Sequence, residues 1–254
     1  MLRNKNYNKF KNYAFLIFVF LAFLEVSSFF VLKFILADYG IIFDKNKITQ
    51  DYNDYLKIRH NILGWDAISE HDDDGARIDH SSFKNSEPCI DVYGNSFTYG
   101  HAKGRHAWPS LLSERLKCRV RNFGVSGYGS DQAHIKFLLR SNHSKIVFLN
   151  HLSENIIRNL NQFRNFIYPS GASFGFKPRY IIDDDNLKLI SIPKISNEKI
   201  YNFLEQPKKY LSNEYFIPNG ASGIQHLGFP YTIKIVKSFN HWHIKEKIRN
   251  LPAK

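Results

Sequence analysis

The stretch GNSFTYG at residues 94–100 decides the fold, and it directly follows the apolar run CIDVY at residues 89–93. A serine in a glycine-bounded turn after a buried strand is typical of a strand-to-helix turn, from which its hydroxyl projects at the carboxyl end of a sheet. The free N–H groups of the following helix favour negative charge that develops there. Ser96 is therefore a candidate nucleophile. Gly, Asn and Ser also build ordinary tight turns, so this heptapeptide alone leaves both interpretations open.

After GNSFTYG the sequence contains further short motifs whose order and spacing resemble those of a known family. WPSLL stands at residues 108–112 and NFGVSGYGSDQ at residues 122–132. Together with GNSFTYG they resemble blocks I and II of the SGNH/GDSL hydrolases, a superfamily of esterases and acyl-esterases. The order continues as in membrane-anchored bacterial members, through VFL at 147–149, SENIIRN at 153–159, NQFR at 161–164 and FKPRY at 176–180. The resemblance covers residues 85–193, less than half of the chain.

Strand-like runs alternate with helix-like segments in this region. We expect strands over 89–93, 118–123 and 145–150, followed by helices that start near 97, 131 and 153. Ser130 is the expected cap of the second helix. This alternation predicts an α/β fold with a parallel sheet, whose strand ends share the edge where such sheets bind ligands. The resemblance implies a three-layer, SGNH or flavodoxin-like sheet, which we expect to be incomplete because no last strand is visible. Residues 180–182 and 187–192 read as a two-stranded excursion with a polar turn.

The resemblance also assigns roles to residues. Ser96 would be the nucleophile, Gly127 the backbone donor and Asn155 the side-chain donor of an oxyanion hole. Block III usually reads glycine-x-asparagine-aspartate, so Glu154 or Asn150 could stand in the place of the expected donor. Two of these residues also have purely structural interpretations: Gly127 as a turn with positive φ, and Asn155 as a helix cap.

The general base is unknown from the sequence. The family carries it in a C-terminal Asp-x-x-His block, but this chain has no aspartate after Asp185. Asp131 and His134 spell the pattern, yet they lie on the helix directly after block II, outside the structural context that the motif requires. Without a base, an unactivated serine would lose several orders of magnitude in rate. Three further histidines have no aspartate three residues earlier: His226, His241 and His243.

The N-terminal region reads as a membrane anchor. Residues 14–32 contain one formal charge, Glu25, and residues 33–37 extend the run, which is long enough to cross the hydrocarbon layer. A mid-membrane carboxylate costs about 2.5 to 3.5 kcal/mol, so we expect Glu25 to be protonated or to face a partner helix. A cleaved signal peptide is the rival interpretation, but the run is long and lacks a small-x-small exit. Basic residues precede the span, which predicts a cytoplasmic N-terminus and a single-pass protein of the cell membrane.

These features divide the chain into four expected parts: a cytoplasmic tail at 1–13, a transmembrane signal anchor at 14–37, a membrane-proximal segment at 38–84 and an SGNH-like domain at 85–254 without the Asp-x-x-His block. In the third part, the aspartates at 72–74 read as a solvated turn rather than a cation site. Its apolar residues could dock on the domain that follows: Tyr52, Tyr55, Leu56, Ile62, Leu63 and Trp65.

Composition narrows the possible partners. The formal net charge is +12, but the basic residues are scattered and accompany no nucleic-acid-binding module. Attraction to anionic lipid headgroups or to an acidic envelope polymer fits the anchor better. Cys89 and Cys118 could form a disulfide, although we favour buried, unpaired roles for both. No metal-ligand spacing is present, and no cofactor is expected.

The function that the resemblance implies is ester hydrolysis or O-acyl transfer through a serine nucleophile, by a membrane-anchored, extracytoplasmic protein. An acylated envelope carbohydrate is the expected substrate, by analogy alone. The alternative is a truncated, non-catalytic protein of the same fold, which acts as a binding or structural module at the membrane. The missing Asp-x-x-His block favours this alternative, and the intact stretches around Ser96 and Gly127 favour the enzyme.

Overall fold

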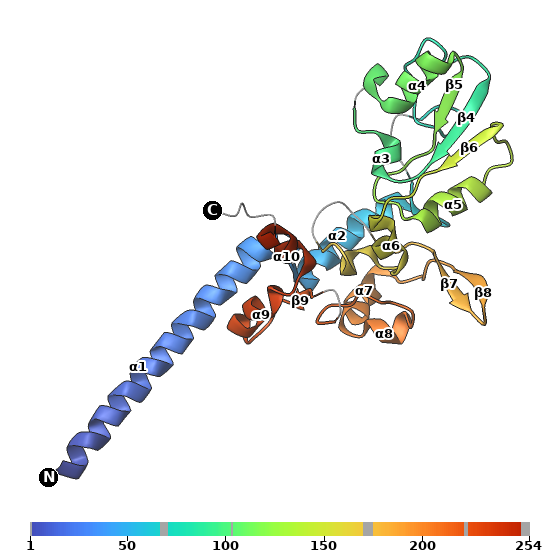
Figure 1. Ribbon diagram of the computed structural model, residues 1–254. Helices are drawn as coiled ribbons and strands as arrows, with labels where there is room; N and C mark the ends of the chain where they lie inside the picture. The colour runs from blue at the N-terminus through green and yellow to red at the C-terminus, as the bar shows by residue number, and fades with distance from the viewer. Residues whose placement is uncertain (1, 67–70, 103, 170–174, 221–222, 250–254) are drawn as a thin grey trace. The chain divides into compact units, whose positions relative to one another are not determined.

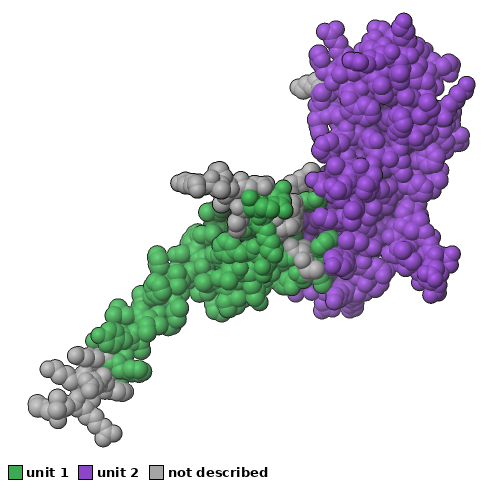
Figure 2. All heavy atoms as spheres, in the orientation of Figure 1, with its two compact units in different colours: residues 1–48, 168–171, 216–254 green, residues 49–167, 172–215 purple. Residues whose placement is uncertain are grey.

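The computed structural model describes residues 2–249 apart from residues 67–70, 103, 170–174 and 221–222. The chain forms two compact units, which Figure 2 shows in different colours. Unit 1 contains Met1–Ile48, Tyr168–Gly171 and Phe216–Lys254, and unit 2 contains Thr49–Ile167 and Ala172–Tyr215. This division differs from the expected boundaries. Residues 49–84 share a unit with the sheet, and residues 216–254 share a unit with the first helix.

Unit 2 contains a three-stranded parallel sheet (Figure 1). Its strands are β4 (Pro88–Tyr93), β5 (Arg119–Asn122) and β6 (Ile146–Leu149), in the order β5-β4-β6. The central strand is buried, with Ile90 and Val92 in an apolar cluster with Val120 and Asp91 in an ion pair with Arg121. The predicted parallel α/β sheet is confirmed.

The helices of this part begin close to the predicted residues. They are α3 (Ser96–Tyr99), α4 (Trp108–Leu116), α5 (Ser130–Leu138) and α6 (Glu154–Asn159), with short 3-10 turns η2 (Gly104–His106) and η3 (Arg164–Phe166). The expected cap of α5 was wrong. Gly129 occupies the N-cap position, and Ser130 is already helical. The Ser130 hydroxyl instead hydrogen-bonds the His151 ring.

The segment before the sheet packs into unit 2. It contains α2 (Lys45–Ile58) and the antiparallel pair β2 (Arg59–His60) and β3 (Gly64–Trp65). The Tyr55 hydroxyl donates to the Phe176 carbonyl at 2.9 Å, and Trp65 Nε1 donates to the Ser126 carbonyl at 3.0 Å. Docking is thus confirmed for the buried members of the predicted set, Tyr52, Tyr55, Leu63 and Trp65, whereas Ile62 is exposed.

The rest of unit 2 follows β6. The predicted two-stranded excursion is confirmed as the antiparallel pair β7 (Arg179–Asp183) and β8 (Asn186–Ile190). Asp184 and Asp185 make its turn with φ of 48° and 60°. The last helices are α7 (Asn197–Glu205) and α8 (Pro207–Tyr210). Four buried phenylalanines pack together between these elements: Phe163, Phe166, Phe176 and Phe203.

The expected unpaired state of the two cysteines was wrong. Cys89 and Cys118 form a disulfide, because Cys89 lies on β4 and Cys118 immediately precedes β5, which brings their Cα atoms to 5.9 Å. The turn expected at residues 72–74 is present, with Asp73 exposed, and its other two aspartates also form ion pairs. Asp72 and Asp74 approach Arg119 to 2.6 and 3.0 Å, and both sides of these ion pairs are partly buried.

Unit 1 is assembled from distant segments. It contains α1 (Leu2–Val31), the π-helical turn η1 (Leu32–Leu36), the parallel pair β1 (Ile42–Phe43) and β9 (Gln225–His226), α9 (Tyr231–Ser238) and α10 (Trp242–Arg249). The helical stretch Phe10–Leu36 has 27 residues, and its most apolar window of 18 residues has a mean hydropathy of 2.5, so it is long and apolar enough to cross a membrane.

Glu25 faces a partner helix within its own chain. Its carboxylate accepts the backbone N–H of Tyr231 at 2.6 Å and that of Thr232 at 3.2 Å. These are unpaired donors of the first turn of α9, and a carboxylate is favourable at a helix N-terminus. The charge in the apolar run therefore stabilises the packing of α9 on α1.

Candidate functional site

The candidate site lies where the three strands of unit 2 end. Backbone hydrogen bonds hold the loops beyond these ends together: Val125 N donates to the Gly94 carbonyl at 3.0 Å, and Asn150 N donates to the Tyr93 carbonyl at 2.8 Å. Gly124 permits this close approach, since a Cβ there would lie 2.4 Å from Tyr99 N. The loops after β4, β5 and β6 consequently form one continuous edge, as the strand-helix alternation predicted.

Ser96 is the first residue of α3 and is half-buried. Asn95 precedes it as the N-cap, in an extended conformation, and its Oδ1 accepts the N–H of Phe97 at 2.9 Å. Gly100 ends the short helix with φ of 68°, which a residue with a side chain rarely adopts. The two ends of GNSFTYG therefore fix the place of the serine between them.

Asn155 contacts this turn directly. Its side chain is fully buried, and its Oδ1 accepts a hydrogen bond from Asn95 Nδ2 at 3.0 Å. Among the described residues, its Nδ2 has no partner. A buried donor without an acceptor costs about 1 to 3 kcal/mol, so such a group usually binds water, an ion or a ligand. The helix-cap interpretation of Asn155 is wrong, because α6 begins at Glu154 after Ser153.

The two alternative donors are engaged elsewhere. Asn150 Nδ2 donates to Thr98 Oγ1 at 2.9 Å. The Glu154 carboxylate lies 3.1 Å from Arg158 Nη2, and its side chain is 54% exposed. Of the three residues considered for the side-chain donor, Asn150, Glu154 and Asn155, only Asn155 has an amide N–H without a partner among the described residues.

Gly127 lies in the loop after β5 and is buried. Its φ of 81° supplies the structural reason for a glycine at this position. Contacts on either side hold its loop: Trp65 Nε1 donates to the Ser126 carbonyl, and Arg158 Nη1 donates to the Tyr128 carbonyl, each at 3.0 Å. The positive φ is compatible with a role for the Gly127 N–H as well, so the two interpretations of this residue do not compete.

The Asp131 and His134 pattern does not form a catalytic dyad. The Asp131 carboxylate forms a buried ion pair with Lys177. The His134 ring hydrogen-bonds the Tyr180 hydroxyl at 3.2 Å. Burial lowers the pKa of Lys177, and the Asp131 carboxylate opposes that effect. Asp131 therefore has a structural partner and does not orient an imidazole.

His151 was missed from the sequence. It lies two residues beyond β6, and its Nδ1 is 2.8 Å from Ser130 Oγ on α5. When Nδ1 bonds the hydroxyl as a donor, Nε2 of the neutral ring carries the lone pair that can accept a proton. The position of His151 just after a predicted strand was the available signal.

The other proposed bases lie outside the described part of unit 2. His226 and His241 are part of unit 1, and the side chain of His243 lies outside the described residues. Within the described residues, no group of three or more His, Cys, Asp or Glu side chains could hold a metal ion.

No family model, curated protein or solved structure matches this chain. The resemblance to SGNH/GDSL hydrolases therefore rests on the stretches around Ser96, Gly127 and Asn155.

Proposed function

We propose that unit 2 carries an ester-cleaving or acyl-transferring site of the SGNH type, with Ser96 as its nucleophile and a sheet arrangement of the three-layer kind. The observation that carries the proposal is the unpartnered Nδ2 of Asn155, which is buried and hydrogen-bonded through its Oδ1 to the residue before Ser96. Such a donor is suited to the negative oxygen that forms when a serine attacks an ester carbonyl. The N–H of Gly127 is the second donor.

In this mechanism the Ser96 hydroxyl attacks the carbonyl carbon and loses its proton to a base. Asn155 and Gly127 stabilise the tetrahedral oxyanion, the alcohol leaves with the proton from the base, and an acyl-serine remains. Water then yields the acid, or a second alcohol accepts the acyl group. We assign the base to His151, because it is at this edge and Ser130 fixes one of its ring nitrogens.

We also propose that α1 anchors the protein, with the N-terminus in the cytoplasm and unit 2 outside. The positive-inside pattern supports this orientation. The Cys89–Cys118 disulfide supports it independently, since disulfides persist in oxidising compartments and are rare in the cytosol. An acylated envelope carbohydrate is the substrate class that we infer, by analogy with the family.

A second candidate function is binding without catalysis through the same edge. One observation favours it: among the described ion pairs the histidine that meets a carboxylate is His143, which lies 3.9 Å from Asp91, whereas His151 contacts a serine. A catalytic imidazole is normally oriented by an acidic partner. Reactivity of Ser96 separates the two candidates.

The test is labelling of the full chain, in neutral detergent, with a fluorophosphonate probe. We expect labelling of wild type and of Ser130→Ala, and none of Ser96→Ala. Ser130 is the matched control because it is a second serine at the same edge, hydrogen-bonded to His151. If the label persisted in Ser96→Ala and vanished in Ser130→Ala, the nucleophile would be wrong. If wild type did not react, catalysis would be abandoned in favour of binding.

A further inference from the structure

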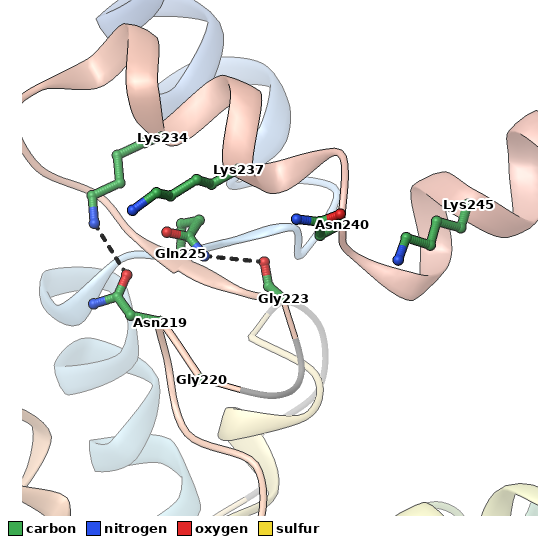
Figure 3. A pocket seen from close by; sticks show the side chains of 8 residues that line it. All are labelled: Asn219, Gly220, Gly223, Gln225, Lys234, Lys237, Asn240 and Lys245. Carbon is green, nitrogen blue, oxygen red and sulfur yellow. Dashed lines mark hydrogen bonds between the residues drawn. The ribbon is translucent and has the colours of Figure 1, made fainter.

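A cavity of about 490 Å³ in unit 1 is lined by basic and amide side chains (Figure 3). Its lining residues are Asn219, Gly220, Gly223, Gln225, Lys234, Lys237, Asn240 and Lys245. Three of these eight residues are lysines and none is acidic. In the part of the chain that the structure describes, no ion pair includes any of the three lysines. The lining therefore offers positive charge and N–H donors to a ligand rich in anionic oxygens.

The donors in the cavity converge from different elements. Figure 3 shows the side chains of Lys234 and Lys237 extending from α9 toward β9 and the loop before it. Lys234 Nζ donates to Asn219 Oδ1 at 3.1 Å, and the N–H of His226 donates to the same oxygen at 3.2 Å. Burial and the nearby charge of Lys237 lower the pKa of Lys234. A bound anion would oppose both effects, because it compensates the two ammonium groups.

With 3.6 residues per turn, the side chains of α9 fall into three sectors around the helix: one packed, one apolar and exposed, and one basic. The sector of Tyr231, Thr232 and Ile235 packs on α1 and η1, where Thr232 Oγ1 lies 3.0 Å from Ser28 Oγ. The adjacent sector is apolar but exposed, at 51% for Ile233 and 63% for Val236. The third sector carries two of the three cavity lysines, Lys234 and Lys237.

The exposed apolar side chains of α9 lie on a helix that packs against the membrane-length stretch of α1. The apolar stretch Phe10–Leu36 has 27 residues, whereas about 20 helical residues cross a hydrocarbon core. Helix α9 contacts Glu25, Ser28 and the cluster around Leu32, so it lies beside the C-terminal half of this stretch, and only the Leu32 end of that contact falls within the last seven residues. Phe229 and Phe239 flank α9 and are also exposed, at 72% and 57%. Apolar side chains beside lysines are typical of a helix at the membrane interface.

We propose that α9 lies at the membrane interface and that the lysine cavity beside it binds the phosphate headgroup of an anionic phospholipid. The proposal rests on the proposed anchoring by α1. Free phosphate offers the same anionic oxygens, but the exposed apolar sector next to the lysines favours a ligand that brings acyl chains with it.

The experiment measures lipids retained by the full chain in native mass spectrometry, after purification in neutral detergent with equal amounts of phosphatidylglycerol and phosphatidylcholine. We expect wild type to retain phosphatidylglycerol preferentially, and Lys234→Gln/Lys237→Gln to reduce this preference about 30-fold, from the loss of two lysines at a headgroup. The control is Lys208→Gln/Lys209→Gln, which removes two exposed lysines from α8. It should behave like wild type. An unchanged preference in the first variant, or an equal loss in the control, would overturn the proposal.

Two further measurements distinguish lipid from free phosphate as the ligand, and test the membrane anchoring separately. If millimolar inorganic phosphate displaced phosphatidylglycerol from wild type, the cavity would be a site for free phosphate and the lipid proposal would be wrong. If alkaline carbonate released the chain from membranes, the anchoring would fail, whatever the lipid ratio. Resistance to carbonate together with equal retention of both lipids would reject the cavity assignment and leave the anchor intact.

Discussion

Asn95 Nδ2 donates to Asn155 Oδ1 across 3.0 Å, and this bond joins two buried amides that lie 60 residues apart in the chain. Asn95 Oδ1 is already occupied by the N–H of Phe97. Asn155 therefore uses its amide oxygen to bond Asn95, and its NH₂ group takes no part in this contact. The pairing with Asn95 thus leaves the Nδ2 of Asn155 without a partner among the described residues, beside the turn that carries Ser96.

Asn155→Ala should slow the labelling of Ser96 by about 10² to 10³-fold, the usual cost of one oxyanion donor. The matched control is Asn150→Ala at the same edge, whose amide is bonded to Thr98. It should change the rate much less. The measurement is the second-order rate of fluorophosphonate labelling of the full chain, with folding checked by circular dichroism. Equal rates for Asn155→Ala and wild type would remove Asn155 from the site.

His151→Gln should lower the same labelling rate by about 10² to 10⁴-fold, since general base catalysis contributes on that scale. Glutamine keeps a polar group at the position but cannot take the serine proton. Ser130→Ala should have a smaller effect, because it removes only the group that fixes the ring. The pH–rate profile distinguishes these roles: it should flatten in His151→Gln and keep its form in Ser130→Ala. A profile unaltered in both variants would show that another group is the base.

Local sequence patterns predicted the elements of unit 2 well because each one depends on neighbouring residues. The apolar runs of β4 and β6, and the polar turn between β7 and β8, have their causes within a few positions. Apart from its apolar first helix, unit 1 could not be predicted in this way. Its strand pair joins Ile42 to Gln225, and Glu25 has its partners at residues 231 and 232. Such pairings depend on tertiary packing, which leaves no periodic pattern in the sequence.

The candidate site shows the same contrast. Ser96 was predicted because its turn is local, and Asn155 and Gly127 because they match positions in a resemblance. The His151–Ser130 contact was missed, since it joins the end of one strand to the start of a helix that precedes that strand. The disulfide was missed for a similar reason: only the register of β4 with β5 shows that Cys89 and Cys118 are adjacent.

Removal of the disulfide should destabilise unit 2 without removing its reactivity. A cross-link between cysteines 29 residues apart contributes about 3 to 4 kcal/mol on the chain-entropy scale. Cys89 and Cys118 lie at the starts of β4 and β5, whereas Ser96 lies beyond the end of β4. We expect Cys89→Ser/Cys118→Ser to unfold at lower urea than wild type and still to label at Ser96 in the absence of urea. An unchanged urea midpoint would contradict this prediction.

Glu214 should make unit 2 less stable as the pH rises. Its carboxylate accepts N–H groups of Gln162 at 2.7 Å, Phe163 at 3.1 Å and Asn161 at 2.8 Å. Burial nevertheless raises its pKa from 4.5 to about 7. Between these two values the folded chain binds more protons at this group than the unfolded chain does. Its contribution to the free energy of unfolding is therefore complete below pH 4.5 and is lost as the pH rises through about 7.

Glu214→Gln isolates this effect, because glutamine stays neutral at every pH. At pH 5 the variant should be less stable than wild type, since its amide has one oxygen for three N–H donors. By pH 8 this deficit should shrink by up to about 3 kcal/mol, because wild type then bears the cost of a partly buried charge. Urea unfolding of both full-length chains in neutral detergent, at a series of pH values, provides the comparison. A deficit that stays constant or grows with pH would show that Glu214 is ionised in the folded chain throughout this range.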